Sequence, residues 1–483
     1  MMHNRLFVSF LWNTVGVFGH GVGYIVVTII LSRFLPPSDF GVVGVLLVLN
    51  SIASILIDGG FGQAIIRDRN ITNDKLSSVF ILNISIAFLL YSFLWAVTPF
   101  LCHFFKLAIP IWQIRLLFFT IIIESSTIMQ RTMLVRNMDF RWLAFAQGCS
   151  TVIAGIAAVF VAMKQGGLLS LILYYVSYSL VNSVILWSKK TQWELRLIFY
   201  WTAVKGYLSF SINLLLSMFA DRFIGNLESL LIGRFYTPAD LAFFTRAKEL
   251  DNWTGRKLID IVLKTSYPAL ARIRDDEQNF KSIYRDILGI TVFGDTFLMT
   301  LFILASGGII ELLWGSAWSG TEIYVLPWCL WGAFFPFQAI CTNLFQVFGR
   351  TDLYLRLSVI RQILRICGIA FFAHISIISM TWAIVIASIA GGFLIIFYGS
   401  RLLGVSSFCF IWDSRITIIA AVVSYFLVNS ADFYMKKLPL LLNVVCTGTV
   451  FAIAYLLCNL IFKNPYLKKT FVLISLKKNF LQS

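Results

Sequence analysis

The stretch RFLPPSD at residues 33–39 recurs as RFYTPAD at residues 234–240, with Arg, Phe, Pro and Asp identical in the two copies. The copies start 201 residues apart (234 minus 33), and each joins an odd-numbered apolar block to the next one. A weaker echo links QRTMLVRNMD at residues 130–139 with QVFGRTD at residues 346–352. Six apolar blocks separate the copies, so a duplication gives both halves the same orientation in a membrane, related by an axis along the membrane normal.

The apolar blocks continue along the whole chain. Of its 483 residues, 59% are hydrophobic and 13% are charged, and the mean hydropathy is +0.84. A helix of about twenty apolar residues crosses the roughly 30 Å hydrocarbon layer, and helices keep every backbone group hydrogen-bonded in lipid. About fourteen blocks meet this length, near residues 10–32, 40–60, 78–101, 111–130, 142–163, 168–187, 207–232, 241–264, 287–310, 321–345, 354–373, 379–399, 413–430 and 438–461.

These features predict an all-α polytopic membrane protein. Twelve of the about fourteen transmembrane helices form two parallel six-helix bundles around a central cavity, and two further helices are appended at the C-terminal end. The predicted domains are an N-terminal bundle at residues 1–187, an amphipathic cytoplasmic linker at 188–206, a C-terminal bundle at 207–400, and two extra helices with a basic tail at 401–483. The apolar run that follows Arg5 is long and lacks a small-x-small cleavage site, which predicts a retained first span rather than a signal peptide.

Basic residues fall on alternate sides of the predicted spans. With the N-terminus inside, 25 Lys and Arg residues lie in cytoplasmic segments, 6 lie on the opposite face, and the remaining 8 of 39 lie within spans. Because Lys and Arg are retained in the cytoplasm, this bias predicts an inner-membrane protein with both termini cytoplasmic. Topology thus accounts for most of the net charge of +16, which needs no nucleic-acid partner.

Two classes of site find no support in the sequence. The eight cysteines lie mostly inside apolar blocks, with no CxxC motif and no paired histidine, so neither a metal site nor a disulfide framework is expected. No external loop exceeds about twenty residues, which leaves no room for a soluble catalytic domain, and no catalytic residue is predicted.

The eighth predicted span carries charge that lipid does not tolerate. An ionisable side chain at the bilayer centre costs about 2.5–3.5 kcal/mol, so it faces protein or a hydrated cavity. Most charged residues of this span and one tryptophan share one arc of about 100° at the helical period, and they are Arg246, Glu249, Trp253, Arg256, Lys257, Asp260 and Lys264. Lys248 and Asp251 lie off this arc. Opposite charges at helical spacing, as in Arg246 with Glu249, leave open that they form structural ion pairs. The basic groups otherwise suit a pyrophosphate, to which Arg offers a bidentate fork.

Polar residues also occur in other predicted spans. Span seven carries Asn213, Asp221 and Glu228 on one stripe, with Arg222 about a quarter-turn away, and span four carries Glu124. The acids Glu124, Asp221, Glu228 and Asp260 are candidates for coupling to H⁺ or Na⁺, against the alternative of helix-to-helix hydrogen bonds. Span one places Gly16, His20 and Gly23 on one face, which suits close helix packing or a cavity wall.

Several short segments, in this order along the chain, resemble those of the Wzx-type polysaccharide or O-antigen flippases of the multidrug/oligosaccharidyl-lipid/polysaccharide exporter superfamily. They are Asp58–Ile66 (DGGFGQAII), Ile232–Phe235, Thr245–Ala247, Pro268–Asp276, Trp314–Trp318 and Gly349–Asp352. The resemblance runs from about Arg5 to about Gly404, most of the chain. The chain departs from the family at residues 242–247, AFFTRA, where the family commonly has G-L-Y-x-R-A and so a tyrosine hydroxyl.

The resemblance implies a flippase that carries undecaprenyl-diphosphate-linked oligosaccharide repeat units from the cytoplasmic to the periplasmic leaflet by alternating access. The expected products are O-antigen, capsule or exopolysaccharide, and the expected partners are the lipid-linked oligosaccharide, membrane lipids, a polysaccharide polymerase and chain-length machinery. In this interpretation Arg222, Arg246, Arg256 and Lys257 hold the diphosphate, and Asn213 and Trp253 line the glycan cavity. No cofactor is expected beyond a coupling ion. A lipid II flippase or a cation-coupled multidrug exporter remains an alternative within the same fold, and a membrane-embedded polysaccharide polymerase is the alternative of another class.

Overall fold

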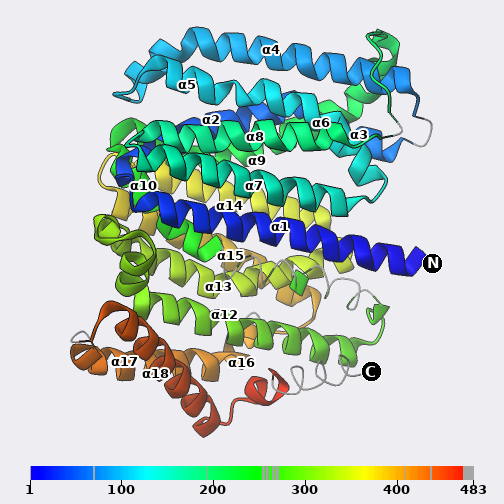
Figure 1. Cartoon of the computed structure of the whole chain (residues 1–483). Helices are drawn as coiled ribbons and strands as arrows, with labels where there is room; N and C mark the ends of the chain where they lie inside the picture. The colour runs from blue at the N-terminus through cyan, green and yellow to red at the C-terminus, as the bar shows by residue number, and fades with distance from the viewer. Residues whose placement is uncertain are drawn as a thin grey trace. The chain divides into compact units, whose positions relative to one another are not determined.

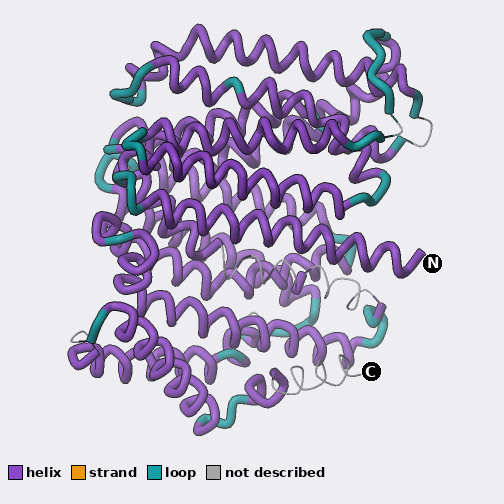
Figure 2. The backbone as a smooth tube through the Cα atoms, viewed as in Figure 1, coloured by secondary structure: helices purple, strands orange, loops and turns teal. Residues whose placement is uncertain are grey.

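The computed structural model describes residues 2–68, 71–191, 193–252, 256, 259, 262–263, 266, 270, 272–406, 408–435 and 438–470. Within these residues every regular element is a helix, drawn in purple in Figure 2. The chain divides into two compact units, Met1–Ala242 and Phe243–Ser483, which we call the first and the second unit. The boundaries predicted for two bundles and a linker stay a prediction.

The first unit is a set of long helices that pack in neighbouring pairs. In Figure 1 α7 lies between α1 and α8, and α4 lies beside α5. Helix α2 packs against α9, α6 and α8, so a helix from early in the sequence of this unit contacts one from near its end. The helices are α1 (Met2–Ser32), α2 (Pro37–Asp58), α3 (Phe61–Arg67), α4 (Asn73–Phe104), α5 (Ile111–Phe118), α6 (Thr120–Arg136), α7 (Phe140–Met163), α8 (Leu168–Ser188), α9 (Trp201–Phe235) and α10 (Pro238–Asp251), the last of which ends in the second unit.

The second unit is organised around α12 (Glu277–Trp314). This helix packs against α13 (Glu322–Val347), α17 (Arg415–Met435) and α18 (Leu440–Ile461), and α15 (Ile377–Leu402) packs against both α13 and α14 (Thr351–Phe372). The short elements are a 3₁₀ helix, η2 (Ser316–Thr321), and α16 (Cys409–Asp413).

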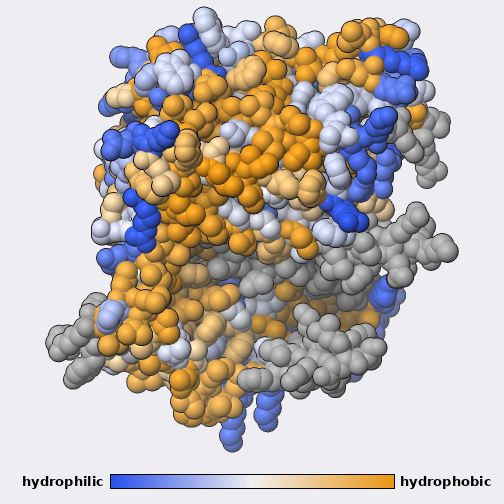
Figure 3. Space-filling view, in the orientation of Figure 1, coloured by the Kyte–Doolittle hydropathy of each residue, from blue (hydrophilic) through white to orange (hydrophobic). Residues whose placement is uncertain are grey.

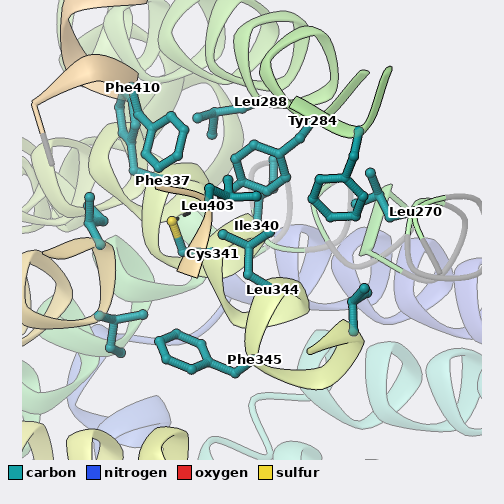
Figure 4. Packing of buried hydrophobic residues seen from close by; sticks show 14 of the residues in the cluster. Leu270, Tyr284, Leu288, Phe337, Ile340, Cys341, Leu344, Phe345, Leu403 and Phe410 are labelled. Carbon is teal, nitrogen blue, oxygen red and sulfur yellow. Dashed lines mark hydrogen bonds between the residues drawn. The ribbon is translucent and has the colours of Figure 1, made fainter. Parts of the chain in front are cut away.

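A buried apolar core holds α12 and α13 together. Figure 4 shows Tyr284 and Leu288 of α12 packed against Ile340, Cys341 and neighbouring side chains of α13. The Tyr284 hydroxyl and the Cys341 Sγ atom are hydrogen-bonded at 3.1 Å, so this polar group is satisfied inside the core.

Both copies of the repeated sequence stretch fold into the same junction. In the first copy α1 ends at Ser32 and α2 begins at Pro37, and in the second copy α9 ends at Phe235 and α10 begins at Pro238. Proline suits the first helical turn, because its fixed φ is helical and its missing N–H has no partner there. The duplicated stretch therefore encodes a helix–turn–helix junction twice, while the parallel arrangement of two bundles stays a prediction.

Among the described residues, ten helices are long and apolar enough to span a membrane, compared with about fourteen predicted spans. Helices α9 and α14 coincide with predicted spans seven and eleven but are not among the ten. Both carry several charged side chains along their length, which lowers their hydropathy. In Figure 3 the visible face of the first unit has apolar side chains along the middle of its helices and hydrophilic ones toward their ends, as a lipid-facing surface requires.

The stretch predicted as a linker, residues 188–206, includes the start of a helix. Helix α9 begins at Trp201, so the last six linker residues belong to this helix. Trp193 is 4% exposed and packs against Phe80 and Trp187, which anchors the non-helical segment to α4 and α8.

The face of α1 predicted to pack closely does so against α7. A Cβ atom at Gly16 would lie 2.9 Å from the Ala144 Cβ atom, and His20 Nδ1 is hydrogen-bonded to Thr151 Oγ1 at 2.7 Å. Of the two alternatives for this face of α1, close packing is therefore the one that these contacts support, and His20 is a hydrogen-bonded interface residue.

Replacing Gly16 with Val is expected to lower the melting temperature of the purified protein, because the added side chain overpacks the α1–α7 contact at a cost of about 1–3 kcal/mol. Gly19 on the same helix is a matched control, since a Cβ atom there meets nothing within 4 Å. Thermal unfolding in detergent measures both variants. Equal melting temperatures for Gly16→Val and Gly19→Val would contradict the close contact.

Candidate functional site

A polar cavity lies within the first unit. Its volume is about 680 Å³, and its walls come from α2, α3, α6, α8 and α9. The lining side chains with charged groups are Asp58, Glu124, Arg131 and Arg222. A space of this polarity among apolar helices indicates a hydrated, ligand-sized compartment, since protein pockets for small ligands measure about 300–1,000 Å³.

Helical spacing places the lining residues on facing stripes. Asn50, Ser54 and Asp58 follow one another at intervals of four on α2, and Glu124 and Arg131 lie seven residues apart on α6. Helix α8 contributes Tyr175, Tyr178, Ser179 and Asn182, at positions i, i+3, i+4 and i+7. Residues at these intervals share a helix face, so each otherwise apolar helix turns a polar stripe toward the same space.

Glu124 joins three helices at this cavity. Its Oε1 atom accepts a hydrogen bond from Ser179 Oγ at 3.0 Å, and its Oε2 atom accepts one from Ser54 Oγ at 3.4 Å. Both partners are neutral hydroxyls on α8 and α2, and within the described part of the chain no cation forms an ion pair with this carboxyl group. Such an acid can take up or release a proton without breaking a salt bridge, so its coupling role stays a candidate.

Two guanidinium groups line the same cavity. Arg131 comes from α6 and Arg222 from α9, and the side chains of both are exposed to the open space. Across the described ranges neither forms an ion pair with an acid, whereas nine other ion pairs are formed elsewhere. Their donors are therefore available to an anionic ligand, and guanidinium binds phosphate through two parallel hydrogen bonds.

Arg246 and Arg256, the predicted phosphate ligands of the second unit, are engaged in ion pairs. Arg246 is 4% exposed and donates to Glu249 Oε2 at 2.6 Å, and Arg256 Nε donates to Asp251 Oδ2 at 2.9 Å. The Arg246 guanidinium also lies 5.5 Å from the centre of the Trp318 ring. These contacts favour the alternative in which the charges of this segment are structural ion pairs.

Some of the other predicted site residues lie outside the described part of the chain, and two acids lie on α9. Trp253, Lys257 and Asp260 lie outside the described residues, as does the side chain of Asn213. Asp221 lines a smaller cavity of about 420 Å³ together with Arg222, and Glu228 is fully buried on the same helix. A joint diphosphate site of Arg222 with Arg246, Arg256 and Lys257 stays a prediction.

Sequence reasoning missed Arg131 and the two tyrosines of α8. The predicted span at residues 111–130 ends one residue before Arg131 and so leaves it in a cytoplasmic segment, but α6 continues to Arg136, and Arg131 lies inside the helix two turns after Glu124. Tyr175 and Tyr178 also contact α1, through the Tyr24 hydroxyl at 3.1 Å and the His20 ring at 5.0 Å between centroids. The i, i+3, i+4, i+7 spacing of polar residues in α8 is the signal that could have found this stripe.

The chain is similar to known proteins of polysaccharide biosynthesis. The family model described as "Polysaccharide biosynthesis protein" matches residues 30–322, which is more than half of the chain. Teichuronic acid biosynthesis protein TuaB of Bacillus subtilis is 22% identical over 345 residues, 70% of each chain. Lipopolysaccharide biosynthesis protein WzxC of Escherichia coli is 21% identical over 354 residues, 72% of this chain and 71% of the relative.

Among solved structures, the lipid II flippase MurJ in an inward closed conformation is similar with a TM-score of 0.68. The superposition covers 94% of this chain and 98% of that chain at 13% sequence identity. At this identity the likeness concerns the fold alone.

Proposed function

Since this chain belongs to the polysaccharide biosynthesis protein family, among the Wzx-type flippases of the multidrug/oligosaccharidyl-lipid/polysaccharide exporter superfamily, we propose that it flips a lipid-linked oligosaccharide. The substrate is an undecaprenyl-diphosphate-linked repeat unit destined for O-antigen, capsule or exopolysaccharide. It moves from the cytoplasmic to the periplasmic leaflet of the inner membrane by alternating access. A polysaccharide polymerase and chain-length machinery are the proposed partners downstream.

The observation that carries this proposal is the polar cavity that the guanidinium groups of Arg131 and Arg222 line, neither of which forms a salt bridge within the described residues. A diphosphate presents several anionic oxygens, which match two Arg forks, and a glycan presents many hydroxyls. Tyr178 and Asn182 of α8 supply hydrogen-bonding groups for such hydroxyls in the same cavity. The polyprenyl tail needs no protein pocket, because it stays in the lipid phase.

A multidrug exporter fits this cavity less well. Its substrates are cationic, whereas the cavity presents two guanidinium groups, Arg131 and Arg222, together with the acids Asp58 and Glu124, so it lacks the acidic excess that a cationic substrate favours. A lipid II flippase remains the second candidate, because lipid II carries the same diphosphate and the solved structure of MurJ has a similar fold. The relatives are named as biosynthesis and transport proteins. No feature of the cavity favours the alternative of a membrane-embedded polymerase.

Deletion of the gene in its native host, followed by complementation with this chain, tests the function. We expect the deletion to abolish surface polysaccharide, to leave lipid-linked repeat units in the cytoplasmic leaflet, and to be reversed by the intact chain. A strain that keeps its surface polysaccharide but loses peptidoglycan synthesis would identify a lipid II flippase instead. A strain that becomes only drug-sensitive would identify an exporter, and glycosidic bond formation by the purified protein would identify a polymerase.

A further inference from the structure

An unpaired acid lies deep inside the second unit. Asp295, near the middle of α12, is only 4% exposed, and neither of its carboxylate oxygens has a hydrogen-bond partner in the described part of the chain. A buried ionised carboxylate without hydrogen bonds or a counter-charge is strongly unfavourable, and such a group either becomes neutral or binds a cation. Asp295 therefore requires an explanation that packing does not supply.

A second carboxylate converges on the same place. Asp251 is 1% exposed, and while its Oδ2 atom pairs with Arg256, its Oδ1 atom has no hydrogen-bond partner among the residues that the structure describes. A Cβ atom at Gly332 of α13 would lie 2.8 Å from Asp251 Oδ1 and 2.6 Å from the sulfur of Met299. Because Met299 lies one turn after Asp295 on α12, the free oxygen of Asp251 faces the helix segment that carries Asp295.

In the described part of the chain, only one acid of this pair, Asp251, forms an ion pair with a cation. Asp251 and Asp295 are close enough for their charges to repel each other, and both act on Cys329 of α13. The facing cation is Arg256, while Lys248 acts on Asp251 from its own helix and lies 5.6 Å from the centre of the Trp328 ring. Both cations act on Asp251, so within the described residues Asp295 keeps its negative charge unpaired when it is ionised, and a single proton neutralises it.

Two other titratable groups near α12 are engaged in contacts of their own. The Tyr455 hydroxyl of α18 donates a hydrogen bond to the carbonyl oxygen of Phe293 at 2.9 Å. Asp286, on the same helix as Asp295, pairs with Lys469, and it lies nine residues earlier, about 13 Å along the helix axis. Among the residues that the structure describes, Asp295 is thus left without a hydrogen-bonded or paired cation.

We propose that Asp251 and Asp295 form a proton-binding site, in which the two carboxylates share one proton beside Arg256. The proton adds to a carboxylate oxygen as COO⁻ becomes COOH, and no other bond changes. A metal cation fits less well, because hard cations take about six oxygen ligands, whereas three free carboxylate oxygens meet here with the sulfur atoms of Cys329 and Met299. If the proposed flippase function holds, the uptake and release of this proton couple substrate movement to the proton gradient.

Infrared difference spectroscopy on the purified full-length protein, titrated with pH in the absence of substrate, tests the site directly. We expect a carbonyl band of a protonated carboxyl group that disappears in Asp295→Asn and persists in the matched control Asp286→Asn. The amide of Asp295→Asn imitates the neutral acid, so its melting temperature is expected to equal or exceed that of the wild type. If the carbonyl band persists in Asp295→Asn as well as in the control, or if Asp295→Asn is less stable than the wild type, the proposal is wrong.

Two further measurements separate the alternatives. A melting temperature that rises with Na⁺ in the wild type but not in Asp295→Asn would show a sodium site and overturn the proton assignment. In proteoliposomes with a lipid-linked oligosaccharide, a pH gradient is expected to accelerate flipping at least tenfold in the wild type and Asp286→Asn but not in Asp295→Asn. Failure of flipping in all variants, with the spectroscopic band intact, would refute the proposed function and leave the proton site standing.

Discussion

Replacing Arg131 and Arg222 together with Ala is expected to lower surface polysaccharide in the native host by at least tenfold while the protein still inserts in the membrane. Each guanidinium offers charge-assisted hydrogen bonds to the diphosphate, and such bonds contribute about 1.5–3 kcal/mol each. Loss of both therefore weakens binding by about 3–6 kcal/mol, or roughly 100- to 10,000-fold. Immunoblots of surface polysaccharide and of the membrane-inserted protein measure the two quantities separately.

The control for this variant is Arg115→Ala. Arg115 is a basic residue of α5 that does not line the cavity, and its guanidinium lies 3.7 Å from the centre of the Trp95 ring. This control is expected to keep polysaccharide near the wild-type level. Wild-type polysaccharide in the Arg131→Ala, Arg222→Ala double variant, at normal membrane abundance, would remove both arginines from the site.

The second large effect concerns stability rather than transport. Arg246→Ala is expected to lower the melting temperature strongly, because it removes the partner of Glu249 and the cation that lies beside the Trp314 and Trp318 rings. Breaking a buried ion pair costs about 3–5 kcal/mol, and because the Glu249 side chain is 30% exposed, we expect the lower end, about 3 kcal/mol. Transport per folded molecule is expected to stay close to that of the wild type.

A double-mutant cycle with Arg246→Met and Glu249→Gln separates pairing from substrate contact. If Arg246 acts through Glu249, the double variant recovers part of the stability that either single variant loses. An Arg246→Ala protein with unchanged melting temperature and abolished transport would instead place Arg246 in contact with the substrate, as the charged stripe first suggested.

Helix positions were largely predictable from the sequence, because in lipid the length and hydropathy of a segment decide its structure. The predicted blocks at residues 40–60 and 379–399 correspond to α2 and α15, and the repeated RFLPPSD stretch marks a junction that forms twice. Family membership was also accessible, from short segments such as Asp58–Ile66, and the family match confirms it. These features are local in sequence.

The candidate site was less predictable, because it depends on contacts between distant helices. Glu124 meets Ser54 and Ser179, which are 70 and 55 residues away in sequence, and no periodicity on α6 reveals those partners. Arg131 was placed in a loop because hydropathy falls before the helix ends at Arg136. The convergence of Asp295 with Asp251 likewise arises from the packing of α12 with α13, which composition does not show.

Flipping by the purified protein tests the central claim most directly. Proteoliposomes that contain a lipid-linked oligosaccharide on the inner leaflet are challenged from outside with a glycan-modifying enzyme, and newly accessible glycan is measured over time. We predict that the wild-type protein exposes glycan well above the rate of protein-free liposomes, and that the Arg131→Ala, Arg222→Ala variant falls to that background. Background exposure with the wild-type protein, or equal rates for wild type and variant, would contradict a flippase whose site is the cavity of the first unit.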